Sequence, residues 1–268
     1  MSISQNPIGQ FFLKSMMSVL IGQERLQFYS TIDWQQESDR IRKTDLIYPH
    51  YYRSQNFHGI EGGYLNSIAA MTYDTVTAFA SPPSENWIRQ QLISAIEQEP
   101  KRILDLGCGT GSSTLMLKQA FPQAAVMGLD LSPYMLVVAE KKAQQARLNI
   151  QWQHGLAEDT GLEETAFDLV TASFLLHETP PQISLLILQE CFRLIKPGGQ
   201  VIILDGNQKR LRHADWLIQL FQEPYSKVYA AGSVEDWMKQ VRFEAVQTEY
   251  IGWIDQVTCG VKPIRSGG

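Results

Sequence analysis

The sequence predicts an α/β fold in which a mostly parallel sheet carries helices on both faces, and three observations support it. Residues 102–106 form a short apolar run typical of a buried parallel strand, and a glycine-rich turn and a helical segment follow directly. Further apolar runs alternate with helical segments as far as residue 242. Two extended segments, 243–250 and 251–261, then end the pattern, and we expect them to form an antiparallel pair.

The individual elements follow from apolar periodicity and from turn residues. The first helix is expected at 112–121, directly after glycines that let the backbone turn tightly. Lys196-Pro-Gly-Gly199 predicts a turn that leads into a strand at 200–205. The remaining strands are expected at 125–130, 150–153 and within 167–178, and the remaining helices at 183–194 and 234–242.

Composition restricts the classes of partner and compartment. The 268 residues carry a net charge of -5, which disfavours a nucleic-acid partner because phosphate neutralisation needs a basic face. Three cysteines, Cys108, Cys191 and Cys259, are too few for a disulfide framework and indicate a reducing, cytoplasmic location. No apolar run reaches the roughly 18 residues that a membrane-spanning helix needs. Residues 11–21 are interrupted by Lys14 and do not resemble a signal peptide.

The glycine-rich turn predicts a nucleotide-type cofactor site. Gly107, Gly109 and Gly111 are spaced Gly-x-Gly-x-Gly, whereas a dinucleotide fingerprint requires Gly-x-Gly-x-x-Gly. Ser112 stands where the third glycine of that fingerprint would be. The spacing therefore counts against NAD or FAD.

Two acidic residues complete the motif. Asp105 precedes the turn, and Asp130 ends the next expected strand. Together with the glycines they resemble the first two motifs of class I S-adenosylmethionine (SAM) dependent methyltransferases of the small-molecule type, over about residues 87–262. This resemblance implies a Rossmann-like, seven-stranded, mostly parallel sheet. It also implies SAM as the cofactor and S-adenosylhomocysteine as the product.

The resemblance assigns roles at the cofactor. Asp105 would shape the methionine end, and Asp130 would accept hydrogen bonds from the ribose hydroxyls, each contributing about 1.5 to 3 kcal/mol. Asp130 could instead cap a helix that begins at Ser132-Pro133. Cys108 is either a thiol activated by the turn or simply a small residue that fits. The expected contacts from this region are Asp105, Gly107, Cys108, Gly109, Thr110, Gly111, Asp130 and Leu131.

Two later segments extend the resemblance in the expected order. Residues 154–159 resemble the adenine-side loop, with Ala157 and Glu158 at the positions that meet the ring and its amine. The segment that follows would deliver Ser173 to the cofactor and His177 to the same edge of the sheet. His177 is the candidate general base, although in many relatives a histidine here shapes the cofactor pocket.

The sequence leaves other candidates for the general base. His50, His58 and the tyrosines of the N-terminal region are alternatives, and no spacing selects among them. No compact cluster of metal-ligating residues stands out, so we expect no metal. The domain plan is an N-terminal, mainly helical cap at 1–86 and a SAM-binding domain at 87–268 with a substrate-covering insert at about 207–233.

The cap is the region where the acceptor would be selected. Apolar residues between Ile8 and Leu20 recur at helical spacing, and this face could be a lid, a membrane-surface contact or core. Thr72-Tyr73-Asp74 resembles the Tyr-Asp pair in the cap of the ubiquinone and menaquinone C-methyltransferases, so Tyr73 is expected at SAM. Aromatic residues are expected to wall the acceptor pocket. That pocket is assigned to Tyr51, Tyr52, His58, Tyr64, Phe174, Tyr225 and Tyr229.

The expected function is methyl transfer from SAM to a small acceptor that is aromatic or partly apolar. Two rivals are a catalytically silent SAM-binding regulator and a nicotinamide-dependent oxidoreductase. Since this fold serves O-, N-, S- and C-methylation alike, neither the methylated atom nor the oligomeric state follows from these residues.

Overall fold

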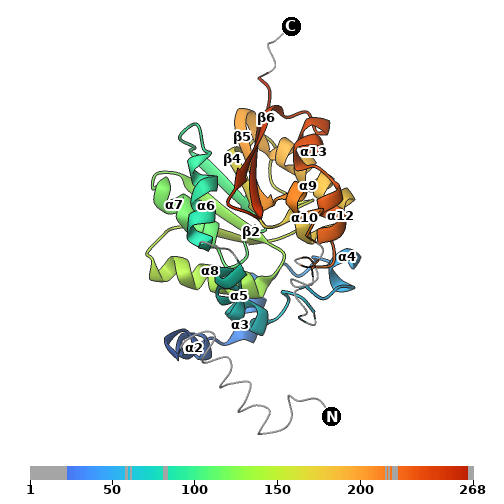
Figure 1. Cartoon of the computed structure of the whole chain (residues 1–268). Coiled ribbons are helices and arrows are strands. Elements are labelled where there is room, and N and C mark those ends of the chain that lie inside the picture. Colours follow the sequence, from blue (N-terminus) through green and yellow to red (C-terminus); the bar gives the residue numbers. More distant parts are fainter. Residues whose placement is uncertain are drawn as a thin grey trace.

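The computed structural model of the chain centres on a seven-stranded sheet with the strand order β3-β2-β1-β4-β5-β7-β6 (Figure 1). It describes residues 23–57, 60, 62–80, 84–214, 216, 218 and 223–264. The apolar helix expected between Ile8 and Leu20, and also His58, lie outside these described residues.

The sheet is parallel apart from its last strand pairs. β1 lies parallel between β2 and β4, and β7 runs antiparallel to both β5 and β6. The predicted fold class, with its closing antiparallel hairpin, is confirmed. The strands are β1 Arg102–Leu106, β2 Ala125–Asp130, β3 Gln151–His154, β4 Phe167–Ser173, β5 Ile195–Gly206, β6 Glu244–Ile251 and β7 Asp255–Val261.

Helices cover both faces of the sheet, on either side in Figure 1. α6 (Glu85–Ser94), α7 (Ser112–Ala120) and α8 (Pro133–Gln145) lie on one face. α9 (Pro181–Leu194) and α13 (Val234–Gln240) lie on the other. Each face has its own apolar core, because side chains of a buried parallel strand alternate between two covered faces: Leu104 and Leu106 join one core and Ile103 the other.

Two local expectations differ from the structure. β4 ends at Ser173 instead of continuing to residue 178, and the 3-10 turn η2 (Leu176–Glu178) follows it. The expected turn at 196–199 lies inside β5 as an irregularity in its pairing with β4. The reason is that the Gly198 N–H donates to the Lys262 carbonyl at 2.7 Å, which ties the bulged segment to the residue after β7.

The N-terminal helices α3 and α5 pack against α8, at the lower end of the molecule in Figure 1, whereas α4 lies to the right, below α12 (Ser226–Ala231). An apolar cluster that includes Tyr29, Phe57 and Met135 joins the two parts, and ion pairs Arg40–Glu140 and Lys142–Asp74 flank it. The division of the chain into a cap and a catalytic domain at residue 86 stays a prediction. The N-terminal helices are α2 Gln23–Ser30, α3 Trp34–Ile41, α4 His50–Arg53 and α5 Ser67–Ala80.

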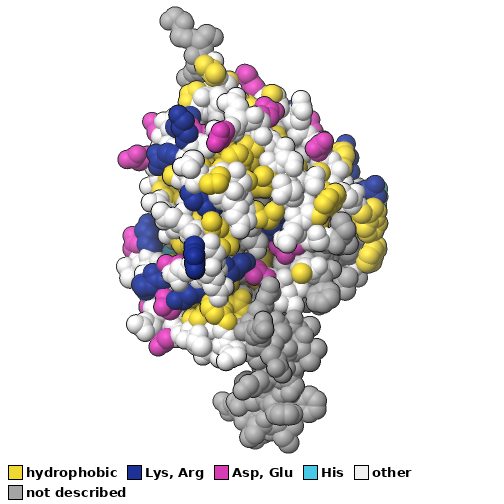
Figure 2. Space-filling model, turned by 90° about the vertical axis from the view of Figure 1, so that its left-hand side faces the viewer, with side chains coloured by type: hydrophobic (Ala, Val, Ile, Leu, Met, Phe, Trp, Pro, Cys, Tyr) yellow, Lys and Arg dark blue, Asp and Glu magenta, His cyan; other side chains and the backbone are white. Residues whose placement is uncertain are grey.

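Among the described residues, two short helices lie between β5 and α13. They are α10 (Gln208–Leu211) and α12 (Ser226–Ala231), within the segment expected to form a substrate-covering insert. On the face shown in Figure 2, basic and acidic side chains are intermixed among apolar ones. Within the described part of the chain, no helix has both the length and the apolar character needed to cross a bilayer.

Candidate functional site

A cavity opens at the carboxyl ends of β1, β2 and β4, which is the edge where open α/β sheets bind ligands. The space between its walls, open solvent included, is about 700 Å³. Its walls are Tyr51, Tyr52, Tyr64, Tyr73, Gly107, Gly109, Leu129, Asp130, Leu131, Met135, Leu156, Ala157, Glu158, Phe174, Leu175, Glu178, Thr179 and Ile187.

The glycines of the turn serve two purposes. At Gly109, where φ is +53°, an added Cβ would meet only Tyr73 Cε1, at 3.8 Å, so this position leaves room for a ligand. At Gly107 a Cβ would lie 2.7 Å from Leu175 Cδ1, and at Gly111 it would lie 2.8 Å from the Trp152 ring. Gly107 and Gly109 line the cavity, whereas Gly111 packs against the protein and caps α7.

Asp130 holds the turn in place from the tip of β2. Its carboxylate accepts the Gly109 N–H at 2.8 Å and the Ser132 N–H at 2.7 Å. The N-cap of α8 is Ser132, whose hydroxyl oxygen accepts the Met135 N–H, and not Asp130. Burial raises the pKa of Asp130 to about 6, although the two backbone donors lower it. A buried carboxylate at the cavity wall is suited to accept further hydroxyl donors.

Asp105 supports the turn from behind and does not line the cavity. It is fully buried and accepts hydrogen bonds from the Thr114 and Thr171 hydroxyls at 2.6 and 2.8 Å. Burial raises the pKa of its carboxyl group, and these two donors oppose that shift. The position fits a structural brace for β1, β4 and α7.

Three other expected cofactor residues also lie beside the cavity instead of in its wall. Cys108 is buried, and burial followed by the charge of Asp130 raises the pKa of its thiol well above the usual value, so it is no activated nucleophile. The Thr110 hydroxyl donates to Asp74, which also pairs with Lys142 at 2.9 Å. The Ser173 hydroxyl shares a hydrogen bond of 3.0 Å with the buried Ser113 hydroxyl.

The residues expected on the adenine side lie together at one part of the cavity. Leu131, Ala157 and Glu158 all line the cavity, next to one another beyond β2 and β3. The Tyr51 hydroxyl of α4 donates to Glu158 Oε1 at 2.8 Å. This bond joins the N-terminal region to the adenine-side loop.

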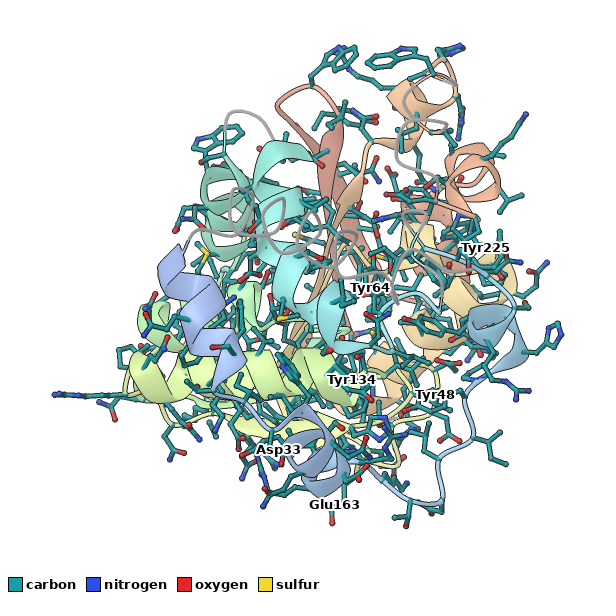
Figure 3. The ribbon with its side chains drawn as sticks, turned by 90° about the horizontal axis from the view of Figure 1, so that it is seen from below. Asp33, Tyr48, Tyr64, Tyr134, Glu163 and Tyr225 are labelled. Carbon is teal, nitrogen blue, oxygen red and sulfur yellow. The ribbon has the colours of Figure 1, made fainter. Side chains whose placement is uncertain are left out.

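Tyrosines of the N-terminal region form the opposite wall. The Tyr64 N–H donates to the Tyr52 hydroxyl at 3.0 Å, and the Tyr64 and Tyr73 rings meet edge to face at 5.7 Å. Burial raises the pKa of Tyr52, Tyr64 and Tyr73, so these phenols stay protonated at neutral pH. Seen from below, Tyr64 lies centrally and Tyr225 toward the C-terminal helices, whereas Glu163 lies at the rim (Figure 3).

His177 lies beneath the cavity and is not one of its walls. Its Nδ1 is 2.5 Å from Asp205 Oδ1 and its Nε2 is 3.4 Å from Glu223 Oε1. Burial alone would lower the pKa of His177, but these two carboxylates raise it well above its usual value. A protonated imidazole has no lone pair, so this geometry does not favour His177 as a base.

Tyr225 and Tyr229 also stand outside the cavity wall. Tyr229 is fully buried in the core, and its hydroxyl donates to the Gly206 carbonyl at 2.9 Å. Tyr225 donates to the Tyr51 carbonyl at 2.6 Å and thereby joins the insert to α4. Phe174, by contrast, lines the cavity as expected.

The sequence analysis did not single out several wall residues, above all Glu178. Glu178 directly follows His177 at the end of η2, so its position at the sheet edge was a usable signal. The others are apolar residues and Thr179, whose exposure to a cavity depends on the packing of distant segments. In the described part of the chain, no three His, Cys, Asp or Glu side chains gather so as to hold a metal ion.

Comparisons with known proteins define the class. A family profile described as a methyltransferase domain matches residues 103–199. Phosphoethanolamine N-methyltransferase 2 of Haemonchus contortus, solved with S-adenosyl-L-methionine, has a TM-score of 0.59 at 17% identity and covers 74% of this chain and 58% of its own. At that identity the likeness shows the fold. Residues 103–199 therefore resemble a methyltransferase domain, and the sheet has the fold of a methyltransferase solved with SAM.

Among curated proteins, the chain is similar to demethylmenaquinone methyltransferases. The one from Oceanobacillus iheyensis is 34% identical over 142 residues, which are 52% of this chain and 59% of that protein. The one from Thermus thermophilus is 35% identical over 137 residues, with 51% and 61% covered. The chain therefore spans about three fifths of the length of these relatives.

Proposed function

We propose that this protein transfers a methyl group from SAM to a small aromatic acceptor. The observation that carries the proposal is the cavity itself, in which Gly109 and Asp130 form one wall and four tyrosines form the other. Bound SAM would supply a methyl group on a positively charged sulfur. Because the chain is similar to demethylmenaquinone methyltransferases, the first acceptor to test is the hydroquinone form of demethylmenaquinone.

The residues present fit this cofactor. Gly109 offers a place where backbone and ligand can approach closely, since only the Tyr73 ring lies near its missing side chain. We assign Asp130 to the ribose hydroxyls and Glu158 to the adenine amine, because both carboxylates line the cavity on the β2 and β3 side. Tyr73 faces Gly109 and is assigned to the sulfonium, which aromatic faces attract as they do other cations.

The acceptor half of the cavity positions the substrate and excludes water. Methyl transfer is an in-line displacement, so the main tasks of the protein are orientation and desolvation. The rings of Tyr51, Tyr52 and Tyr64 give rigid apolar walls with polar tips, which suit an aromatic molecule that carries hydroxyl groups.

The test is an assay of the purified chain with SAM and short-chain demethylmenaquinol kept reduced by borohydride. We expect formation of S-adenosylhomocysteine and of a methylated quinol in equal amounts, together with calorimetric binding of SAM and none of NADH. Gly109→Val should abolish both activity and SAM binding. SAM binding without turnover of this quinol or of a panel of phenols would instead indicate a regulator that binds SAM but methylates nothing.

A further inference from the structure

Three carboxylates line the cavity among the described residues, and they divide into two groups. Asp130 and Glu158 follow β2 and β3, on one side of the glycine turn. Glu178 follows β4, which pairs with β1 on the other side. This inference rests on the proposed function, in which the first two carboxylates hold the cofactor. Glu178 then remains as the carboxylate on the side of the acceptor.

Glu178 is held in a fixed environment. Tyr64 donates its hydroxyl hydrogen to Glu178 Oε1 at 2.5 Å. Tyr64 itself is fixed by two further bonds, since its carbonyl accepts the Ser132 hydroxyl at 2.6 Å and its N–H donates to Tyr52. The Glu178 side chain is 14% exposed, so it reaches the cavity while most of it is covered.

The other titratable groups of this region are poor bases. Burial and the charge of Glu178 raise the pKa of the Tyr64 phenol, and the same two causes raise that of Tyr52, so both hydroxyls remain donors. His177 Nε2 lies 3.9 Å from Glu178 Oε1, but the carboxylates of Asp205 and Glu223 keep its imidazole protonated.

We propose that Glu178 is the general base of the methyl transfer. Its carboxylate takes the proton of the acceptor hydroxyl, which raises the electron density of the aromatic ring. The nucleophilic atom of the acceptor forms a bond to the methyl carbon, and the bond between that carbon and sulfur breaks with its electron pair left on sulfur. Where the nucleophile is a ring carbon, as in demethylmenaquinol, the hydrogen on that carbon is then transferred as a proton to the deprotonated oxygen, which restores the aromatic quinol. The proton on Glu178 leaves to solvent when the products depart. The site therefore selects acceptors that carry an ionisable hydroxyl group.

The experiment compares Glu178→Gln with the unchanged protein, with short-chain demethylmenaquinol as acceptor. The amide keeps the size of the side chain and can still accept the Tyr64 hydroxyl, but it cannot take a proton. We expect kcat to fall about 100-fold or more, the scale of general base catalysis, while the Kd for SAM changes less than twofold. The exposed Glu163→Gln is the matched control and should leave both quantities unchanged.

A second variant guards against a purely structural effect. Tyr64→Phe removes a hydrogen bond donated to the carboxylate, so the acidic limb of the kcat profile should move to higher pH. In Glu178→Gln that limb should be absent. If Glu178 had only a structural role, the variants would lower kcat equally at every pH, and the pH profile of kcat would keep its position.

Each outcome decides the proposal. Loss of kcat and of the acidic limb, with SAM binding intact, supports Glu178 as the base. Retained kcat and an unchanged pH profile in Glu178→Gln overturn this role and leave the methyltransferase function standing. If the unchanged protein binds SAM but does not methylate the quinol, the proposed acceptor fails, and the role of Glu178 toward it fails as well.

Discussion

The two walls of the cavity are built in different ways. The cofactor wall comes from one stretch of chain and the next strand tip, and backbone groups held by Asp130 give it its shape. The acceptor wall joins segments far apart in sequence through side chains, such as Tyr64 to Glu178 and Tyr225 to Tyr51. The comparison teaches that the first wall is a property of a local strand-turn-helix unit, whereas the second exists only in the complete fold.

The largest effect is expected from Gly109→Val, which changes the cofactor wall alone. A branched side chain would enter the space where the ligand must lie, and we expect loss of SAM binding by a factor of at least about 100, measured by calorimetry. Gly161→Val is the matched control, since Gly161 also has a positive φ, +68°, but lies in open space outside the cavity wall. Equal SAM affinity in the two variants would contradict the assignment of the turn.

The next largest effect is expected at His177, which supports the acceptor wall from below. His177→Ala leaves the buried Asp205 carboxylate without its partner, a loss of about 3 to 5 kcal/mol in the free energy of unfolding. The Kd for SAM should stay nearly unchanged because His177 does not line the cavity. His50→Ala, an exposed change on α4, is the control. A large rise in the Kd for SAM would place His177 in the cofactor wall after all.

The same residue predicts a pH dependence. The folded-state pKa of His177 lies above the unfolded value of about 6.5, so its contribution to stability is complete below that value and is lost as pH rises through the folded pKa. Burial also raises the pKa of Asp255, to about 7, so its contribution makes stability fall as pH rises toward that value. Between about pH 7.5 and 8, below the range in which cysteines and tyrosines ionise in the unfolded chain, the further fall of Tm should mainly report His177, and it should be smaller in His177→Ala.

A smaller effect tests the cofactor wall at Asp130. Asp130→Ala should weaken SAM binding by about 1.5 to 3 kcal/mol through loss of the ribose contact. Since ribose hydroxyls prefer the ionised carboxylate and its pKa is raised to about 6, SAM affinity should increase as pH rises through 6. Titrations at pH 5 and 7.5 would show about a tenfold difference, absent in Asp130→Asn and retained in the exposed Asp236→Asn. An effect on Tm alone would leave Asp130 a purely structural brace.

The smallest effect is expected from Tyr225→Phe, which tests how the acceptor wall is held in place. Tyr225→Phe removes the hydrogen bond to the Tyr51 carbonyl, worth about 0.5 to 1.5 kcal/mol. We expect a rise of severalfold in the acceptor KM and an unchanged Kd for SAM. Tyr134→Phe, whose ring packs against the N-terminal apolar cluster outside the cavity wall, is the control for loss of a hydroxyl. If both variants behave alike, the insert does not shape the acceptor site.

Much of the sheet could be predicted because apolar runs and glycine turns are local signals. The strands at 102–106 and 125–130 have the predicted bounds, and β3 is displaced by one residue. The bulge within β5 escaped prediction because it depends on Gly198 pairing with Lys262, which lies 64 positions along the chain.

The sequence predicted the site residues that lie at the ends of strands. It did not predict those whose positions depend on contacts between distant segments. Asp130, Gly109 and Glu158 line the cavity as expected, since each follows a strand at the binding edge. His177 was placed at the correct edge, but its carboxylate partners Asp205 and Glu223 could not be read from spacing. Tyr229 has the same residue type as the wall tyrosines, yet packing places it in the core.

Two of the three free thiols, Cys108 and Cys191, are buried, and Cys259 is partly exposed. Burial is the first cause that raises the pKa of Cys108, Cys191 and Cys259, so each is almost wholly a thiol near neutral pH. Alkylating reagents act on the thiolate, so the buried Cys108 and Cys191 should react only when the chain opens. The rate of their alkylation would therefore measure how often the native protein opens.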